Sequence, residues 1–337
     1  MPETSIVIIN WKGRDDTYKC INSVCKSDYK NFEIILIDND SGDGSVEFFR
    51  KKFPQKLFSN LRIIANPCNA GLAEGFNIGI RNSKGDFVFL LTNDTILEKL
   101  CLGELVKTIK SNLHTAIVSP KIKNLKAYGR KETSGAILNI LFQVVDIPKK
   151  VSETSMANGT AMLLRKSSFQ ENPFIPEYFG NCEDVFISIL AQIKGYKIAV
   201  NPKAGLIHTG SVSVSKVPDL MSFHMDKNFI LNFFILYQVS TILRLLPVFI
   251  ILQFLTMLNA LFTGKFMHKA KSCFWIIKNL PLIPKYRKRI KSQRTISDSR
   301  LISSVLSSNL PVSGIMVGIL NPLMRFYLII FGFKTRY

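Results

Sequence analysis

Short apolar runs alternate with helix-like segments through the first hundred residues, and this alternation limits the folds available to the chain. The apolar and β-branched runs, which predict strands, are residues 5–10, 33–38, 61–64 and 87–91. The segments between them that predict helices are residues 15–27, 45–52 and 71–83. Such alternation is typical of a mainly parallel sheet with helices on both faces, so we predict an α/β fold.

The pattern continues beyond the fourth run. Thr95-Ile96-Leu97-Glu98 matches a capping box, which predicts a helix that reaches about Asn112. Asn158–Leu164 predicts a further strand, and a helical pattern begins at Glu183-Asp184. Acidic residues in a first helical turn often only interact with the helix dipole, so this pair also has a purely structural interpretation.

Three of the predicted strands end on polar residues, which are Asn10, Asp38 and Asp94. In open α/β sheets ligands bind outside the carboxyl ends of the strands, so these residues form a candidate site. Each carboxylate also has a structural interpretation, because Asp38 lies among turn-forming residues and Asp94 can support the start of the next helix. Both carboxylates end strongly apolar strands, which favours the functional interpretation.

Residues 69–79, NAGLAEGFNIG, contain glycines four positions apart. This spacing places the glycines on one face of a helix, where they allow another part of the chain to approach closely. The segment is not GxGxxG, and no apolar strand directly precedes it, so a dinucleotide-binding function is only weakly supported. His208 follows the apolar run 204–207, and a single His at the end of a strand is usually an ordinary loop residue.

Charge is distributed unevenly along the chain. Residues 1–220 hold 28 Lys and Arg and 22 Asp and Glu, whereas residues 221–337 hold 16 and 2. The first part has the balance of a soluble domain, and the second is basic and apolar together, which favours an anionic membrane surface as partner. The basic runs lie among apolar helices without an aromatic stacking platform, so we expect no nucleic acid. Six cysteines without a CxxC pair, and no segment like a signal peptide, predict a reducing, cytosolic location.

The basic second part contains long apolar stretches. Residues 229–262 predict a helix that Pro247 should kink or break, and residues 245–263 alone are long enough to span a bilayer. A basic zone follows at residues 265–294, then a weaker apolar stretch at 311–333. Full crossing would place the basic zone outside, so we favour a broken helical hairpin or in-plane helices over true spans. Core helices of a second soluble domain are a further alternative, which the scarcity of acidic residues disfavours.

The order and spacing of seven segments resemble the family-2 glycosyltransferases with the GT-A fold, in particular their rhamnosyltransferase-like branch. The segments are SIVIINWKG (5–13), EIILIDNDSGDGS (33–45), NAGLAEGFNIGI (69–80), GDFVFLLTNDT (85–95), NGTAMLLRK (158–166), CEDVFISILAQIKGYKI (182–198) and GLIHTGS (205–211). The resemblance implies a GT-A catalytic domain with a Rossmann-like sheet over residues 1–220. A membrane-associated helical region would then occupy residues 221–337.

The resemblance also implies a divalent metal, Mg²⁺ or Mn²⁺, that neutralises the departing diphosphate. Asp94 matches the metal-binding position of the family. Thr92 stands where the family often has Asn or Asp, so the ion would be held by one protein carboxylate, phosphate oxygens and water. His208 matches a position that in some relatives helps to hold the metal or the diphosphate.

Asp184 matches the catalytic base, which would take the proton from an acceptor hydroxyl in a single inverting displacement. Burial that raises its pKa toward neutrality would suit this role. Phe186 replaces the last Asp of the family pattern E-D-x-D, which puts the acceptor site in doubt but spares the base. Asp38 matches the position that accepts a hydrogen bond from the nucleotide base. The other candidate substrate-binding residues are Asn10, Asn39, Gly71, Asn77, Asn93, Gly159 and Glu183.

The resemblance therefore implies an inverting, metal-dependent glycosyltransferase that moves a sugar from a UDP- or dTDP-sugar, with a tilt toward dTDP-rhamnose, to a glycan. We expect the acceptor to be lipid-linked and the enzyme to work at the cytoplasmic face of the membrane. Residues 121–157 are a candidate acceptor loop. The alternative is a non-catalytic membrane protein that binds nucleotides at the same edge of the sheet.

Overall fold

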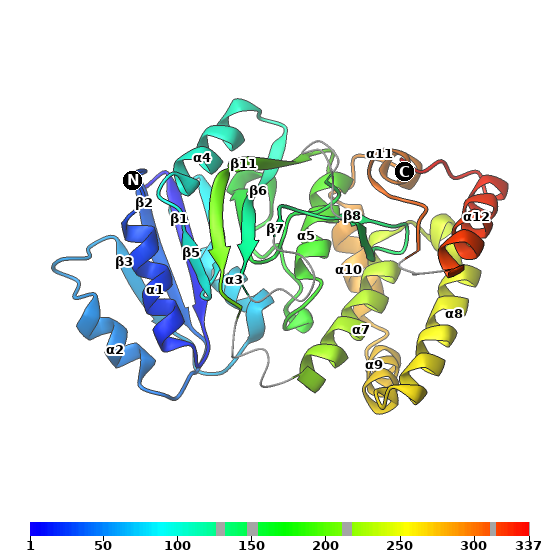
Figure 1. Cartoon of the computed structure of the whole chain (residues 1–337), viewed down its shortest axis with the longest axis horizontal. Coiled ribbons are helices and arrows are strands. Elements are labelled where there is room, and N and C mark those ends of the chain that lie inside the picture. The colour runs from blue at the N-terminus through cyan, green and yellow to red at the C-terminus, as the bar shows by residue number, and fades with distance from the viewer. Residues whose placement is uncertain (126–131, 147–153, 211–217, 311–314, 337) are drawn as a thin grey trace.

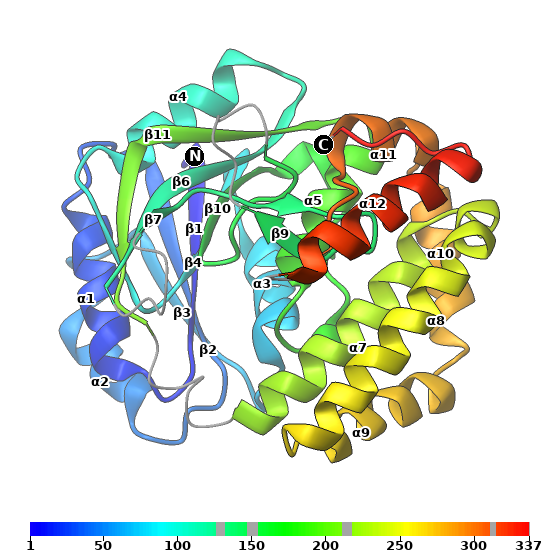
Figure 2. The same cartoon turned by 45° about the vertical axis from the view of Figure 1, so that its right-hand side comes forward.

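The computed structural model describes residues 1–125, 132–146, 154–210, 218–310 and 315–336. A curved sheet with its helices forms one half of the molecule, and a group of C-terminal helices forms the other half (Figures 1 and 2). The α/β class predicted from the sequence is confirmed.

The first part of the sheet follows the predicted alternation of strands and helices. Its elements are β1 (Thr4–Asn10), α1 (Arg14–Cys25), β2 (Phe32–Asp38), α2 (Ser45–Lys52), β3 (Leu61–Ala65), α3 (Gly71–Asn82) and β4 (Phe87–Thr92). The strands lie in the order β3, β2, β1, β4, and every neighbouring pair is parallel. Their carboxyl ends therefore meet at one edge of the sheet, where the sequence predicts a site.

The second part of the sheet is mixed. Its elements are β5 (Thr95–Leu97), α4 (Cys101–Ser111), β6 (Thr115–Asn124), β7 (Glu132–Thr133), β10 (Ala161–Arg165), two 3₁₀ turns (Lys166–Ser168 and Pro176–Tyr178), α5 (Glu183–Ile193) and β11 (Lys197–His208). β8 (Ile137–Leu138) and β9 (Val144–Asp146) form a separate two-stranded sheet. β10 pairs antiparallel with both β4 and β6, while β11 runs parallel to β6. The candidate acceptor loop at 121–157 lies partly outside the described residues.

The predicted helix start at Thr95 is wrong. Thr95–Leu97 is strand β5, which pairs antiparallel with the end of β11, and helix α4 begins only at Cys101. The backbone of β11 offers this segment hydrogen-bond partners, and the Thr95 hydroxyl donates to the carbonyl of Thr92 instead of capping a helix. The pairing sets His208 opposite Thr95. Strand β5, which the sequence pattern predicted to be the start of a helix, therefore brings His208 to the candidate site.

Helices cover both faces of the sheet and leave it buried between two apolar layers. α1, α2 and α4 pack on one face, and α3, α5 and the C-terminal helices pack on the other. The predicted close approach at the glycine face of α3 is confirmed, because a Cβ on Gly79 would lie 2.2 Å from Val7 Cγ1. A Cβ on Gly75 would lie 2.8 Å from Ile9 Cδ1. These glycines let α3 lie directly on β1.

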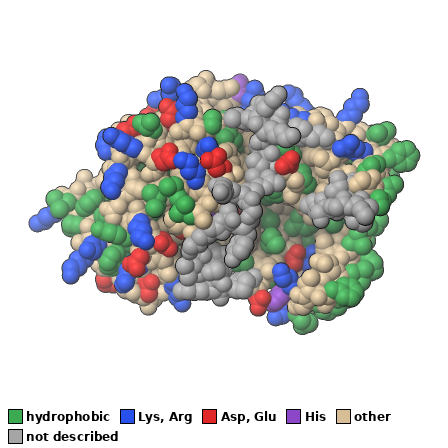
Figure 3. Space-filling view, in the orientation of Figure 1, with side chains coloured by type: hydrophobic (Ala, Val, Ile, Leu, Met, Phe, Trp, Pro, Cys, Tyr) green, Lys and Arg blue, Asp and Glu red, His purple; other side chains and the backbone are tan. Residues whose placement is uncertain are grey.

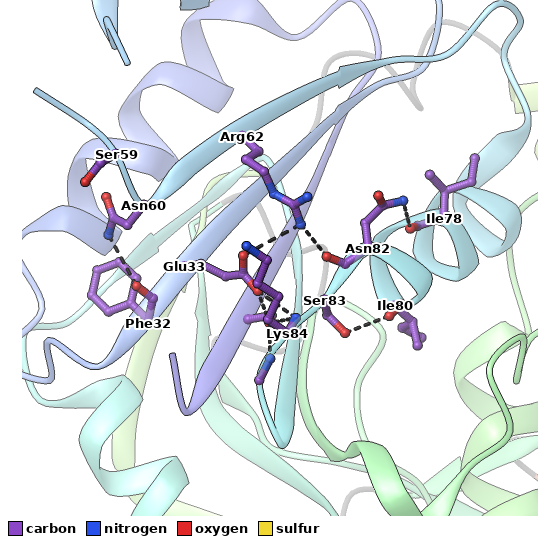
Figure 4. Close-up of polar contacts among 12 residues, drawn as sticks. Phe32, Glu33, Ser59, Asn60, Arg62, Ile78, Ile80, Asn82, Ser83 and Lys84 are labelled. Carbon is purple, nitrogen blue, oxygen red and sulfur yellow. Dashed lines mark hydrogen bonds and ion pairs between the residues drawn. The ribbon is translucent and has the colours of Figure 1, made fainter. Parts of the chain in front are cut away.

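A buried polar network secures the edge of the sheet opposite the candidate site (Figure 4). Glu33 Oε1, at the start of β2, accepts hydrogen bonds from the Ser5 hydroxyl and from the backbone N–H of Lys84, both at 2.7 Å. Its other oxygen lies 3.7 Å from the guanidinium of Arg62 on β3, which also donates to the carbonyl of Asn82. The network joins β1, β2, β3 and the segment that leads into β4.

The C-terminal half is helical. Its helices are α7 (Pro218–Leu236), α8 (Val239–Phe262), α9 (Phe266–Lys278), α10 (Leu282–Lys291), α11 (Asp298–Val305) and α12 (Ile315–Ile330). Within the described part of the chain, α8 is the one helix whose length and apolar composition would suffice to cross a membrane. The predicted domain boundary at residue 220 lies near the start of α7.

Pro247 lies inside α8 and does not break it, so of the two predicted outcomes, a kink or a break, the break is wrong. The chain turns instead between α7 and α8, where the backbone N–H of Gln238 donates to Asp298 Oδ2 at 2.6 Å. Phe249, two residues beyond Pro247, stacks on Phe233 of α7 with ring centroids 4.0 Å apart. This packing on α7 holds α8 continuous across the missing proline hydrogen bond.

Candidate active site

A pocket of about 410 Å³ opens at the carboxyl ends of β1 and β4. Predicted site residues among those that line it are Asn39, Gly71, Asn93, Asp94, Glu183 and His208. The sequence interpretation missed the apolar part of the wall, which includes Trp11, Leu72, Phe179, Leu220 and Met221. Trp11 could have been recognised from the sequence, because it directly follows the predicted strand end at Asn10. The other four residues do not follow a predicted strand end and line the pocket only because of how the chain folds.

Asp94 and His208 face each other in this pocket. The imidazole Nε2 lies 3.0 Å from Asp94 Oδ2, and the other ring nitrogen lies 3.1 Å from Asn124 Oδ1. Burial raises the pKa of Asp94, but the hydrogen bond and charge of His208 outweigh it, so the net pKa is lowered. Asp94 is therefore a firmly ionised carboxylate in a buried position, which is the chemistry required of a cation ligand.

The pair fits a divalent cation as a partial ligand set. Carboxylate oxygen suits Mg²⁺ and Mn²⁺, and imidazole nitrogen suits Mn²⁺ better than Mg²⁺. Within the described residues, no group of three or more His, Cys, Asp or Glu side chains is placed to hold a metal. An ion on Asp94 and His208 would thus need further oxygen atoms from its substrate or from water.

Asn93 and Asn10 hold the two neighbouring strand ends together through Thr17. The Thr17 hydroxyl donates to Asn10 Oδ1 at 2.8 Å, and it accepts from the Asn93 amide at 2.9 Å. A Cβ on Gly13 would lie 2.5 Å from the same amide, so a larger residue here would require the Asn93 side chain to move. Asn10 is fully buried and does not line the pocket.

Asp38 lies behind the pocket wall. Its carboxylate accepts from the Asn10 amide at 2.6 Å and from the backbone N–H of Ser41 at 3.0 Å. The next residue, Asn39, does line the pocket, and its amide donates to the carbonyl of Gly71 at 2.9 Å. Strand β2 therefore presents Asn39 to the pocket, while Asp38 orders the turn that carries it.

Helix α3 meets the loop before α5 at two places. Gly71 has a φ of +75°, and a Cβ there would lie 2.4 Å from the carbonyl oxygen of Phe179. Asn77, predicted to point toward a substrate, is fully buried instead, and its side chain exchanges hydrogen bonds with both backbone groups of Phe174. Asn77 therefore holds residues 174–179 in place and does not line the pocket.

Glu183 and Asp184 open helix α5 on the far side of the pocket. Asp184 Oδ1 accepts from the backbone N–H of Val185 at 2.8 Å, and Oδ2 accepts from that of Gly159 at 3.0 Å. A Cβ on Gly159 would lie 2.9 Å from Asp184 Oδ2, so the glycine permits this approach. Glu183 lines the pocket, and its buried Oε2 has no hydrogen-bond partner among the described residues.

Both carboxyl groups bind protons more tightly than usual. Burial raises the pKa of Glu183 to about 8, and the charge of Asp184 adds to this shift. Burial also raises the pKa of Asp184, although the N–H groups of Val185 and Gly159 oppose it. The pocket therefore holds a firmly ionised Asp94 and a proton-binding Glu183, while Asp184 lies next to Glu183 in the chain and does not itself line the pocket.

The loop before Glu183 is held in an unusual conformation. Phe179, Asn181 and Cys182 all have positive φ angles, between 58° and 65°. The side-chain amide of Asn228 on α7 lies within 2.9 Å of three carbonyl oxygens of this loop, including that of Asn181. This contact could not be predicted from the sequence, because Asn228 belongs to the region predicted to be membrane-associated.

Comparison with known proteins places this arrangement in a family. Residues 5–172 match the family model described as Glycosyl transferase family 2. The chain is 28% identical over 200 residues to Glycosyltransferase AglE of Haloferax volcanii, covering 59% of this chain and 64% of that protein.

A relative from Methanococcus voltae is 24% identical over 175 residues, which is 51% of this chain and 50% of that protein. It is named Dolichyl N-acetyl-alpha-D-glucosaminyl phosphate 3-beta-D-2,3-diacetamido-2,3-dideoxy-beta-D-glucuronosyltransferase. The chain thus spans less than two thirds of the length of both relatives.

The crystal structure of GalNAc-T7 with UDP, GalNAc and Mn²⁺ has a similar fold. Its TM-score is 0.54 at 15% sequence identity, over 68% of this chain and 47% of that one. The likeness concerns the fold alone, and the GT-A class implied by the sequence resemblance is confirmed. Residues 5–172, just under half of the chain, are thus similar to glycosyl transferase family 2.

Proposed function

We propose that the protein is an inverting glycosyltransferase that moves a sugar from a nucleotide-sugar donor to a hydroxyl group of a glycan. The observation that carries this proposal is the composition of one pocket. Asp94 and His208 lie on one wall, and Glu183 lies on the other, with Asp184 beside it. Transfer of this kind needs a site for a diphosphate and a separate carboxylate for the proton of the acceptor.

Asp94 and His208 would hold a divalent cation, for which their oxygen and nitrogen donors fit. When bound, such an ion neutralises the charge that develops on the departing diphosphate. The pair supplies only two protein ligands, which leaves coordination positions for phosphate oxygens and water. Asn124, on the far side of the imidazole, fixes the ring so that Nε2 faces Asp94.

Asp184 would act as the base. The acceptor oxygen forms a bond to the anomeric carbon while the bond from that carbon to the diphosphate breaks, and the acceptor proton passes to the carboxylate. A raised pKa, caused chiefly by burial, makes Asp184 a stronger base than an exposed carboxylate. Glu183, whose Oε2 is free of partners among the described residues, would bind a substrate hydroxyl in the same pocket.

The donor would be a UDP- or dTDP-sugar. Asn39, which lines the pocket, would border the base and the ribose. Asp38 and Asn10 lie behind the wall and bond to each other, so they would order the turn that carries Asn39 and not meet the base directly. The resemblance to the rhamnosyltransferase-like branch favours dTDP-rhamnose among such donors. Gly71 and Asn93 line the pocket and would border the donor, Gly159 would let Asp184 lie close, and Asn77 would support the donor side through residues 174–179.

The acceptor would be a lipid-linked glycan at the cytoplasmic face of the membrane. The Methanococcus voltae relative is named for a dolichyl-phosphate-linked acceptor. In this chain, α7 contributes Leu220 and Met221 to the pocket wall, so the C-terminal helices reach the place where the acceptor must enter. This placement supports an acceptor delivered along the C-terminal region.

The proposal can be tested with one substitution. Asp184→Asn keeps the shape of the side chain and removes the base, so transfer from the donor should fall at least about a hundredfold while nucleotide affinity stays unchanged. Calorimetric titration with UDP, dTDP and GDP, with and without Mn²⁺, would measure that affinity. Transfer that survives in the variant would remove Asp184 from the base role. Nucleotide binding without any transfer by the wild type would instead favour a non-catalytic nucleotide-binding membrane protein.

A further inference from the structure

Exposed apolar side chains gather on the C-terminal helices α8, α9 and α12. Prominent among them are Phe254, Leu258, Phe262, Met267, Phe326 and Ile329, which we call the apolar face. Phe262 is 88% exposed and Ile329 is 71% exposed. Figure 3 shows hydrophobic side chains along the edge of the molecule that α8 and α12 form. Exposed apolar groups in such numbers indicate a binding surface, because water alone solvates them poorly.

The three helices form one continuous surface. The Tyr327 hydroxyl of α12 donates to the carbonyl of Arg244 on α8, and the Arg244 guanidinium lies 5.8 Å from the ring of Phe333. α9 follows α8 after a short turn and packs against it. A planar partner could therefore contact residues from all three helices at once.

Helix α8 lies along the protein instead of projecting from it. One stripe of α8 faces the rest of the chain: Leu245, Phe249 and Ala260 are buried, and Leu252 and Thr256 between them are half-buried. α9 then returns to α7, where the Ser272 hydroxyl donates to the carbonyl of Phe223 at 3.0 Å. A helix that keeps one side against the protein presents its opposite, apolar side to a surface.

The charge of the C-terminal region indicates which kind of partner the apolar face binds. The only carboxylates in residues 221–337 are Asp226 and Asp298. Both are already neutralised, by Lys269 at 3.1 Å and by Arg294 at 2.7 Å. Sixteen Lys and Arg residues share this region, so a second copy of the chain would meet repulsion there. Anionic lipid headgroups complement both the charge and the apolar side chains.

We propose that the apolar face docks flat on an anionic lipid bilayer, with α8 in the plane of the membrane. Phe254, Leu258 and Phe262 enter the boundary between headgroups and acyl chains. Exposed lysines on the same helices, Lys265, Lys271 and Lys278, contact the headgroups. The occupant of this face is the lipid surface and not a protein partner.

The face continues to the mouth of the pocket. His268 on α9 lies 3.2 Å from Asp219 at the start of α7, and the next two residues of α7, Leu220 and Met221, line the pocket. Met267, which precedes His268, belongs to the apolar face. Docking therefore places the pocket mouth beside the lipid surface, where a lipid-linked acceptor presents its sugar. This last step rests on the transfer activity proposed above, whereas docking itself needs no substrate.

Vesicle flotation of the full-length protein tests the proposal. Wild type should float with phosphatidylcholine vesicles that contain phosphatidylglycerol, and less with phosphatidylcholine alone. The triple variant Phe254→Ser, Leu258→Ser, Phe262→Ser should bind at least about tenfold more weakly. The matched control, Leu57→Ser, Leu113→Ser, Leu125→Ser, removes three apolar side chains that are at least 67% exposed on the sheet half, and it should float like wild type. Thermal melting monitored by circular dichroism confirms that both variants fold.

Four results would overturn the proposal. If wild type does not float at all, or if the two triple variants lose binding equally, the face is not the docking site. Retention of bound wild type after an alkaline carbonate wash would show a spanning helix instead of in-plane docking. A wild-type dimer that the Phe254 triple variant dissociates, without flotation of either, would show that a second copy covers the face. None of these measurements depends on sugar transfer, so a failed docking is distinguishable from a failed activity.

Discussion

The side-chain amide of Asn228 on α7 donates to the backbone carbonyl of Asn181 at 2.8 Å, two residues before Glu183. The same amide lies 2.9 Å from the carbonyl oxygens of Tyr178 and Gly180. Non-glycine residues with positive φ persist only where surrounding contacts hold them. The C-terminal helices therefore hold the loop that positions both candidate catalytic carboxyl groups.

Replacing Asn228 should affect turnover more than donor binding. In Asn228→Asp the new carboxylate cannot donate to the three carbonyl oxygens, so the loop relaxes and Asp184 moves from its place. We expect kcat to fall roughly ten- to a hundredfold, with little change in the KM of the donor. Steady-state kinetics with varied donor measure this split. Asn259→Asp on the exposed side of α8 is the control. Equal changes in kcat and Tm for both variants would rule out the positioning role.

Removal of Asp94 should abolish the metal dependence of nucleotide binding. Asp94→Ala leaves His208 as the only side chain of the proposed pair, and one imidazole binds Mn²⁺ weakly. The nucleotide that binds wild type best should lose at least about tenfold in affinity in the presence of Mn²⁺, and little without it. Calorimetry measures both affinities. The exposed Asp15→Ala is the control. An undiminished Mn²⁺ effect in Asp94→Ala would show that the metal binds elsewhere.

Glu183→Gln should become more stable than wild type as the pH rises. The pKa of Glu183 is raised from 4.5 to about 8 in the folded chain, so between these values the folded state holds a proton that the unfolded state has released. The free energy of unfolding of wild type therefore falls as pH rises through this window, and Gln cannot contribute to that fall. We expect nearly equal Tm values near pH 4 and a variant higher by a few degrees at about pH 9. The exposed Glu171→Gln should follow wild type throughout.

The same substitution should leave the acidic limb of the activity profile in place. The pKa of Glu183 is raised to about 8, first by burial and then by the charge of Asp184, so Glu183 is neutral where Asp184 loses its proton. Gln is neutral as well, so the acidic limb of the kcat/KM profile should not move in Glu183→Gln, whereas any change in activity that accompanies ionisation of Glu183 near pH 8 should disappear. An acidic limb that moves would mean that Glu183 is charged beside Asp184. Loss of all activity would instead give Glu183 a direct role in the chemistry.

Two glycine-to-alanine substitutions should have opposite effects on stability. Gly79→Ala on α3 places a methyl group 2.2 Å from Val7 Cγ1, which should reduce the free energy of unfolding by about 1–3 kcal/mol. Gly318→Ala on α12 meets nothing within 4 Å, so the better helix propensity of Ala should raise it by up to about 1 kcal/mol. Urea unfolding measures both changes. A stable Gly79→Ala would show that α3 can move away from β1.

The first part of the fold could be predicted because its signals are local. Between Thr4 and Thr92, polar turns separate one apolar run from the next. Residues near one another in the chain are therefore enough to predict each strand and each helix. The errors arose where distant partners decide. Thr95–Leu97 carries a helix-start pattern, but the edge of β11 turns it into a strand. Pro247 carries a helix-break pattern, but packing on Phe233 and its neighbours maintains α8.

The candidate site was predictable only in its polar part. The sequence pattern shows that Asp94 and His208 lie at strand ends and that Glu183 begins a helix. All three residues line one pocket. Which carboxyl group faces the pocket was not predictable, because it depends on how Gly159 lies against Asp184. The apolar wall from α7 was not predictable either, since it requires the C-terminal helices to fold back over the sheet. The roles assigned to individual residues stay predictions until they are measured.

The pairing of β5 with β11 forms late in folding, because it joins segments that are far apart in the chain. Asp94 and His208 are separated by 114 positions, and they meet only when the last strand of the sheet joins its edge. Closing such a long loop is slow compared with forming a local turn. A nascent chain that has made Asp94 therefore lacks the second ligand of the proposed cation site until nearly the whole GT-A fold has been synthesised. Cation binding would then stabilise only the finished sheet, and incomplete chains would gain nothing from it.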